Sequence, residues 1–202
     1  MNTTSIARLF AIATLAAATA CSPSKKETPE TSTEHNHASA SADSTAADKP
    51  QYAVAAAFQQ QLAGVFTAYL QLKESFVASD AARVQSASQA VQFSLESVDM
   101  TLLQGAAHHD WMTHLENINT TLKAMQTSPA NLDEQRNAFS SLTQSLYLAI
   151  KAYGLGNTTA YYEFCPMAFN NKGGFWLSDS KTIRNPYFGE KMLTCGQVRE
   201  TL

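Results

Sequence analysis

Four sulfur-bearing side chains stand out in the last forty residues of the chain, arranged as two pairs. Cys165 and Met167 are two residues apart, and Met192 and Cys195 are three residues apart. Thiolate and thioether sulfurs form a soft donor set, which selects Cu(I) and its close analogue Ag(I) over hard ions such as Mg²⁺ or Ca²⁺. This paired spacing predicts a soft-metal site made by Cys165, Met167, Met192 and Cys195.

The same two cysteines also allow a simpler interpretation, a disulfide that closes the C-terminal segment. Thiols of exported proteins commonly pair in their oxidising compartment. In the chain-entropy model, a loop of about 30 residues would contribute on the order of 3 to 4 kcal/mol of stability. Most methionines serve only to pack a core, which is the simpler interpretation of Met167 and Met192. Both interpretations of the cysteines stay open at this level.

An export signal is predicted at the N-terminus. Arg8 precedes an apolar run that ends at Ala18 and is too short to span a bilayer as a helix. Small residues up to Ala20 suit a cleavage site, and Cys21 follows directly. The segment resembles a bacterial lipoprotein signal, although Ala18 stands where such signals usually have leucine. We expect residues 1–20 to be removed and lipid on Cys21 to anchor the chain in the cell envelope, facing the periplasm; an ordinary secretory signal is the alternative.

Residues 21–50, which begin with the lipidated cysteine, are expected to form a disordered tether between the membrane and a folded domain. The stretch is rich in Ser, Thr, Ala, Pro, Lys and Glu, with no aromatic side chain and no Leu, Ile or Val. Such a segment cannot bury enough apolar surface to offset the entropy lost on ordering it. Its histidines, His35 and His37, suit weak metal binding, but a solvated linker with incidental histidines is the simpler interpretation.

Four helices are predicted between residues 51 and 156, because apolar residues recur there every three or four positions. The apolar stripes run over Val54–Phe76, Val84–Leu102, Trp111–Met125 and Leu132–Tyr153. Each stripe needs a partner face, and the short connections make neighbouring helices antiparallel. The expected fold is all-α, an up-down antiparallel four-helix bundle, with the glycine-rich segment 157–202 packed on it as part of one domain.

The glycine-rich segment is expected to contain a small β-hairpin and a short helical turn. Two β-prone runs, Ala160–Phe164 and Phe175–Ser178, flank an Asn-Asn-Lys-Gly-Gly sequence suited to a turn. Glu190–Cys195 suits a helical turn, on which Met192 and Cys195 would face the same way. The hairpin and the turn would then carry the two sulfur pairs.

The predicted topology adds two side chains to this site. In four alternating helices, the start of the third lies at the same end as the last residue of the fourth, where the C-terminal segment begins. His108 and Met112 share one face of the third helix because they are four residues apart. We therefore expect His108 and Met112 to lie near Cys165 and Cys195.

Other chemistries are poorly supported, and the chain is not expected to be an enzyme. His108, His109 and Asp110 beside Cys165 would make a thiol-nucleophile site, but spacing alone does not orient such a pair. No glycine-rich phosphate loop precedes a helix. The net charge of −3 and the absence of any basic run argue against nucleic acid as a partner.

An ordered set of motifs resembles a bacterial family of exported domains of unknown function. The motifs are Cys165-Pro166-Met167-Ala168, Trp176-Leu177-Ser178, Ile183 to Gly189 with its Asn185-Pro186-Tyr187 core, Met192 and Cys195-Gly196, preceded by Val98-Asp99-Met100 and His108-x-x-Trp111-Met112. The resemblance runs from roughly residue 69 to the C-terminus. Family members occur as lipoproteins, and the same domain is appended to periplasmic adaptor subunits of copper/silver-type heavy-metal efflux pumps.

The resemblance implies copper handling rather than a particular reaction. Its motifs imply that the Cu(I) ligands are drawn from His108, Met112, Cys165, Met167, Met192 and Cys195. The expected function is a membrane-anchored lipoprotein that sequesters Cu(I) or Ag(I) or transfers it, with copper-efflux or other envelope copper proteins as possible partners. This chain has no recognisable adaptor portion, so docking to a pump is not implied directly. The alternative is a non-metal periplasmic interaction module with a structural Cys165–Cys195 disulfide.

Overall fold

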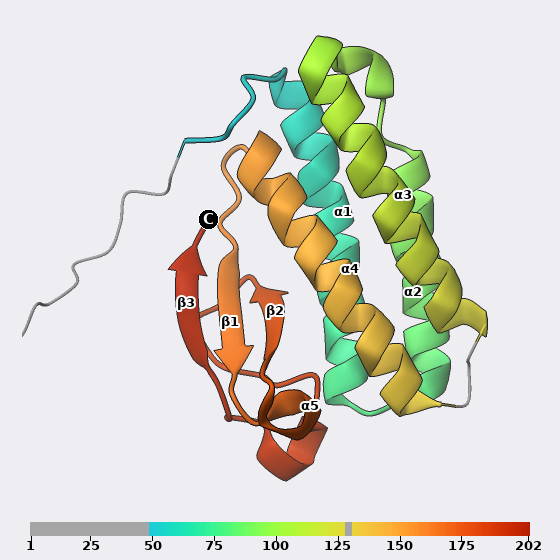
Figure 1. The fold of residues 1–202 in the computed structure, drawn as a ribbon, viewed down its shortest axis with the longest axis vertical. Coiled ribbons are helices and arrows are strands. Elements are labelled where there is room, and N and C mark those ends of the chain that lie inside the picture. Colours follow the sequence, from blue (N-terminus) through green and yellow to red (C-terminus); the bar gives the residue numbers. More distant parts are fainter. Residues whose placement is uncertain (1–48, 128–130) are drawn as a thin grey trace, which may run out of the picture. The chain divides into compact units, whose positions relative to one another are not determined.

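The structure, a computed structural model, describes residues 49–127 and 131–202. The predicted signal segment, Cys21 and the tether up to residue 48 lie outside the described residues. Four long helices make up the first part of the described chain (Figure 1). They are α1 (Ala56–Val77), α2 (Ala81–Glu96), α3 (Gly105–Thr127) and α4 (Leu132–Tyr153), with the single 3-10 turn η1 (Met100–Leu102) between α2 and α3.

The helix ends follow from local side-chain chemistry. The carboxylate of Asp80 accepts a hydrogen bond from the Arg83 N–H at 3.0 Å and begins α2. Asn131 begins α4 in the same way, because its Oδ1 accepts from the N–H groups of Asp133 and Glu134. At the other end of α4, Gly154 adopts a φ of 74°, which ends the helix.

The second helix is shorter than predicted, since α2 ends at Glu96 rather than continuing to Leu102. Asp99 explains the early end. Its carboxylate accepts hydrogen bonds from both the backbone N–H and the hydroxyl of Thr101, at 2.9 and 2.6 Å. Such a local bond offers the backbone an alternative to the helical ladder and produces the 3-10 turn.

The helices bury one continuous core. α1 contacts α2 and α4, and α3 contacts α2 and α4. Aromatic rings fill much of the space between them, and all of them are essentially inaccessible to solvent: Phe58, Phe66, Tyr69, Phe76, Trp111, Phe139 and Tyr153. These rings belong to the apolar stripes predicted for the helices, and each buries a large area of apolar surface.

The C-terminal part of the chain forms a three-stranded antiparallel sheet beside the helices. Its elements are β1 (Tyr161–Cys165), α5 (Ala168–Asn171), β2 (Gly174–Ser178), the 3-10 turn η2 (Gly189–Met192) and β3 (Gln197–Thr201), and the strand order is β2-β1-β3. The predicted hairpin is confirmed as β1 and β2, paired from Tyr161↔Ser178 to Cys165↔Gly174. The prediction of a mainly helical fold is therefore confirmed, and the C-terminal sheet has a third strand in addition to the predicted hairpin.

The sheet is fixed to the helices by side chains from α1 and α4. Tyr69 on α1 accepts a hydrogen bond from the Leu177 N–H at 3.1 Å. Tyr162 on β1 stacks on Tyr147 of α4 with ring centroids 4.0 Å apart. Because of these contacts, β1 runs beside α4 in the opposite direction, as the orange strand in Figure 1 shows. Among the described residues, no helix is both long and apolar enough to cross a membrane.

Candidate soft-metal site

The structure brings Cys165 and Cys195 into direct contact. Their Sγ atoms, from residues 30 positions apart, lie 2.6 Å from each other, and both cysteines are free thiols. This separation is longer than a disulfide bond of about 2.05 Å and well below the roughly 3.5 to 4 Å of non-bonded atoms in contact, so the two side chains are placed to be joined, either as a disulfide or through one shared ion. Cys165 has no solvent exposure, whereas Cys195 is partly exposed. The pair is therefore reached from the side of Cys195.

Cys165 is placed by the β1–β2 hairpin. It is the last residue of β1 and lies opposite Gly174. A Cβ atom on Gly174 would come within 2.7 Å of the Tyr187 ring and 2.9 Å of the Ala168 Cβ. Glycine at this position therefore lets Tyr187 and Ala168 close over the end of the hairpin.

Cys195 is placed by the segment that connects β2 to β3, residues 179–196. Two arginines hold this segment against the helices. Arg184 donates two hydrogen bonds to the Glu74 Oε2 atom of α1, at 2.8 and 3.1 Å, and Arg136 of α4 donates to the carbonyl of Pro186 at 3.2 Å. A turn then follows, in which the Cys195 N–H donates to the Met192 carbonyl at 3.0 Å.

The surroundings of the pair disfavour ionisation of Cys195. Burial and the neighbouring Cys165 thiol raise the pKa of Cys195 to about 11. A metal ion that binds here must therefore displace protons from sulfur, because the thiolate is the ligand. We expect metal binding to the pair to depend steeply on pH.

Met167 and Met192 lie close to the cysteines in the chain but open onto a separate groove of about 630 Å³. The residues that line it include both methionines, three aromatic rings and neither cysteine. Met167 is 47% exposed. Between the methionines, three consecutive residues adopt left-handed backbone angles: Phe169, Asn170 and Asn171, with φ of 52°, 57° and 65°. The two thioethers thus line one groove, and the two cysteines are not among the residues that line it.

His108 and Met112 lie far from the cysteines, so the predicted proximity was wrong. The start of α3 does contact the end of α4, where the Tyr153 hydroxyl donates to the Ala107 carbonyl at 2.7 Å. The segment that carries Cys195 instead contacts Arg136, near the start of α4. Arg136 and Tyr153 are about 25 Å apart on a helix that rises 1.5 Å per residue. The strand β1 runs back along α4 and carries Cys165 away from the end where α4 stops (Figure 1).

The described part of the chain does not hold three clustered His, Cys, Asp or Glu side chains able to bind one metal ion. A metal at the pair would have two thiolates as its strong donors. The nearest soft donors along the chain are the thioethers of Met167 and Met192. Two thiolates with at most neutral sulfur beside them suit a monovalent soft ion better than Zn²⁺, which takes four Cys or His ligands in structural sites.

Glu163, two residues before Cys165 on β1, is a buried carboxyl that the sequence pattern did not single out. The side chain has no solvent exposure, and neither carboxylate oxygen has a hydrogen-bond partner among the described residues. Burial raises the pKa of Glu163 to about 7, and the ammonium group of Lys73 and the indole N–H of Trp176, which lies nearby without completing a hydrogen bond, oppose the rise. The only sequence signal was one acidic residue inside an otherwise aromatic strand, Tyr-Tyr-Glu-Phe-Cys.

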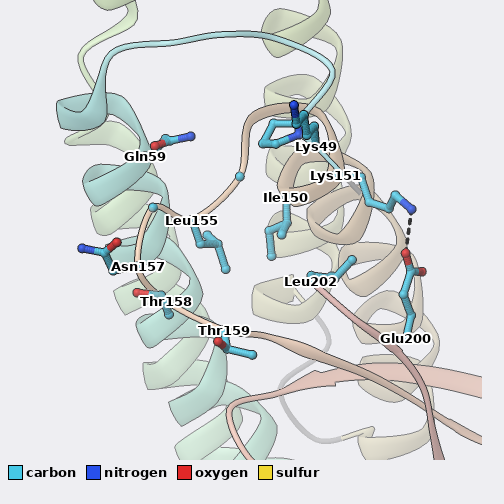
Figure 2. A pocket seen from close by; sticks show the side chains of 13 residues that line it. Lys49, Gln59, Ile150, Lys151, Leu155, Asn157, Thr158, Thr159, Glu200 and Leu202 are labelled. Carbon is cyan, nitrogen blue, oxygen red and sulfur yellow. Dashed lines mark hydrogen bonds and ion pairs between the residues drawn. The ribbon is translucent and has the colours of Figure 1, made fainter. Parts of the chain in front are cut away.

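A second hollow, of about 470 Å³, lies at the end of α4 (Figure 2). Lys151 and Glu200 form an ion pair of 2.6 Å at its wall. Gln59 lines the opposite side, where its amide donates to the Tyr153 carbonyl. Its lining residues include no sulfur and no imidazole, so this hollow does not belong to the candidate metal site.

Comparison with known proteins finds one similarity. A family model described as a protein of unknown function (DUF3347) matches residues 65–158, which run from within α1 to just beyond α4. No curated protein and no solved structure matches the chain. The match ends before the strand that carries Cys165. The chemistry of the cysteine segment therefore has to be inferred from the site itself.

Proposed function

We propose that the chain is an exported protein, anchored in the cell envelope by lipid on Cys21, that binds Cu(I) or Ag(I) for sequestration or transfer. The observation that carries the proposal is the contact between Cys165 and Cys195 at 2.6 Å. Two thiolates that share one soft ion lie roughly 3.5 to 4 Å apart at the bond lengths of thiolate sites, so the two sulfurs would have to move apart by about 1 Å to take up the ion between them. The partial exposure of Cys195 gives the ion a way in.

In this proposal the rest of the fold is a support. We interpret the four long helices as an up-down antiparallel bundle that holds the sheet and the β2–β3 segment in place. Arg136 and Arg184 then serve to fix Cys195 against the helices. The chain would face the periplasm, and its partners would be copper-efflux proteins or other copper proteins of the envelope.

The two methionines would extend the site toward solvent. Met167 and Met192 line one groove, and thioether sulfur binds Cu(I) without losing a proton. An ion held there would need no change of protonation, unlike an ion on the thiolates. The methionines would thus supply weaker ligands on the side from which metal arrives.

A titration of a fully reduced fragment that starts at Ser22, and so lacks the lipidated Cys21, tests the proposal. We expect about one Cu(I) per chain in competition with a coloured Cu(I) chelator. Because each thiol must lose a proton, the apparent affinity should rise by up to about 10-fold per pH unit for each proton released. Protein with alkylated thiols is the control. A Cu(I) affinity that does not change from pH 6 to pH 8 would contradict thiolate ligation.

The second candidate is a non-metal interaction module in which Cys165 and Cys195 form a disulfide. The full burial of Cys165 and its direct contact with Cys195 favour this alternative. A count of free thiols on protein purified from the periplasm, combined with elemental analysis, separates the two. Two free thiols in the folded domain with bound metal support the metal site, and no free thiol without metal supports the disulfide.

If the disulfide forms, oxidation is expected to raise the free energy of unfolding by about 3 to 4 kcal/mol. The reason is the loss of chain entropy in the unfolded state when a loop of about 30 residues is closed. Urea denaturation with and without dithiothreitol measures the difference. The Cys195→Ser protein is the control, since its stability should not respond to the reductant. Equal stability of oxidised and reduced wild-type protein would count against a stabilising disulfide.

A further inference from the structure

We infer that Asn185 is a positioning residue for the cysteine pair, whose side chain holds Cys195 against Cys165. The inference rests on the proposed function, in which the two sulfurs act as one site. It concerns the geometry of the pair before any metal binds. Asn185 touches neither sulfur in the hydrogen bonds of the structure and would act through the backbone of Cys195.

The side chain of Asn185 connects two parts of the β2–β3 segment. It has no solvent exposure. Its Nδ2 donates to the Cys195 carbonyl at 2.7 Å. Its Oδ1 accepts from the N–H groups of Tyr187 and Phe188, at 2.8 and 3.3 Å. One amide thus fixes the start of the turn with its oxygen and the position of Cys195 with its nitrogen.

The backbone of Asn185 makes the same connection. Its N–H donates to the Leu193 carbonyl at 2.8 Å, and its carbonyl accepts from the Gly189 N–H at 3.2 Å. The chain from Asn185 to Cys195 is therefore closed on itself by bonds to a single residue. Gly189 allows this closure because its φ is 56° and a Cβ there would lie 2.7 Å from the Val77 carbonyl oxygen.

The surroundings hold Asn185 in a fixed place. The preceding residue, Arg184, is bound to Glu74, and the carbonyl of the following Pro186 accepts from Arg136. Tyr187 is buried, and its hydroxyl donates to the Phe175 carbonyl of β2. The neighbours of Asn185 are thus bound to α1, α4 and β2. The hydrogen bond from Asn185 Nδ2 to the Cys195 carbonyl connects Cys195 to the same elements. Without this bond, Cys195 would be held by its turn to Met192 and by the start of β3.

The amide has two halves that can be tested separately. Asn185→Asp has nearly the same shape and keeps an oxygen that accepts from Tyr187 and Phe188. It replaces the donor to Cys195 with a second oxygen, which faces the carbonyl without a hydrogen bond when ionised. The variant therefore preserves the turn and removes the contact that we assign to positioning. Asn119→Asp, at an exposed position on α3, is the matched control for the change of charge.

The experiment measures how readily the two thiols pair in the metal-free, full-length protein. In a glutathione redox buffer, oxidised glutathione takes up the two electrons and two protons that the cysteines lose, so the protein disulfide forms as two molecules of reduced glutathione are released. Mass spectrometry of the alkylated peptides reads the oxidised fraction of Cys165 and Cys195. We expect Asn185→Asp to lower the equilibrium constant for pairing by about 10-fold, the usual effect of one buried hydrogen bond, while Asn119→Asp leaves it unchanged.

Thermal unfolding of the same samples separates positioning from general stabilisation. A folded Asn185→Asp protein whose pairing constant is within twofold of wild type would overturn the inference. Asn185→Ala, which has no side-chain donor and cannot regain one by protonation, is the second variant and should show at least the same fall. Failure of both variants to fold would overturn it too, because Asn185 would then support the fold as a whole. Since these measurements use no metal, their outcome is independent of whether the wild-type protein binds Cu(I).

Discussion

Replacing both Cys165 and Cys195 by serine is expected to abolish high-affinity Cu(I) binding. Serine oxygen is a hard, neutral donor at neutral pH and does not substitute for a thiolate on a soft ion. Structural zinc sites with four ligands bind with about 10 to 16 kcal/mol, or roughly 3 kcal/mol per ligand, and we take this as the scale for one thiolate here. Each single substitution should therefore weaken binding by about 100-fold, and the double substitution should reduce it to the level of a nonspecific protein surface.

Competition titration of the variants at constant pH measures this effect, with circular dichroism to show that the helices are retained. Met112→Leu provides a matched control. Met112 lies near the start of α3, which contacts the C-terminal end of α4, whereas the segment that carries Cys195 contacts the first turns of α4. Its replacement should leave the affinity unchanged. Met167→Leu and Met192→Leu should slow metal uptake or weaken binding moderately, since thioethers are the weaker donors. Wild-type affinity in the double-serine protein would refute the metal site outright.

The helical part of the fold could be predicted from the sequence because its signals are local. Apolar spacing, the Asp80 and Asn131 caps and Gly154 together locate the ends of α1, the start of α2 and both ends of α4 closely. The early end of α2 was missed because apolar spacing continues through Leu102. There the hydrogen bonds of Asp99 to Thr101 outweigh the helical pattern.

The third strand could not be predicted because nothing local marks it. β3 contains one strongly apolar residue, Val198, and its partner is β1, more than thirty residues earlier in the chain. The same strand pairing explains the error about the site. The sequence pattern places the start of the C-terminal segment near His108 correctly, but only the sheet determines that β1 then runs back along α4.

The sequence allowed the prediction that the two cysteines lie together, but it did not predict which residues surround them. Spacing could suggest that Cys165 and Cys195 form one site. It could not show that Asn185 makes five hydrogen bonds in the β2–β3 segment, or that Glu163 lies buried two residues before Cys165. Burial and hydrogen bonding of a polar residue depend on the elements packed around it, which come from distant parts of the chain.

The second large expected effect is a loss of stability as the pH rises, and its cause is the buried carboxyl of Glu163. Its pKa is about 7 in the folded protein, against an ordinary value of 4.5. Well below pH 4.5 the carboxyl is protonated in both the folded and the unfolded chain, so it does not change the free energy of unfolding. Between pH 4.5 and pH 7 the unfolded chain ionises while the folded chain holds its proton, so stability falls as the pH rises. A shift of this size corresponds to about 3 kcal/mol at pH 8.

Glu163→Gln is expected to remove this fall, because glutamine has the shape of the protonated side chain and does not ionise. Urea denaturation from pH 4.5 to pH 8 gives the free energy of unfolding of each protein. The wild type should lose about 3 kcal/mol more than the variant over this range. Subtracting the two curves cancels all other titrating groups that the substitution leaves alone. Glu116→Gln, at an exposed position on α3, should follow the wild-type curve. Parallel curves for wild type and Glu163→Gln would mean that Glu163 is ionised in the folded protein at no cost, by pairing with Lys73 or with water that enters the sheet.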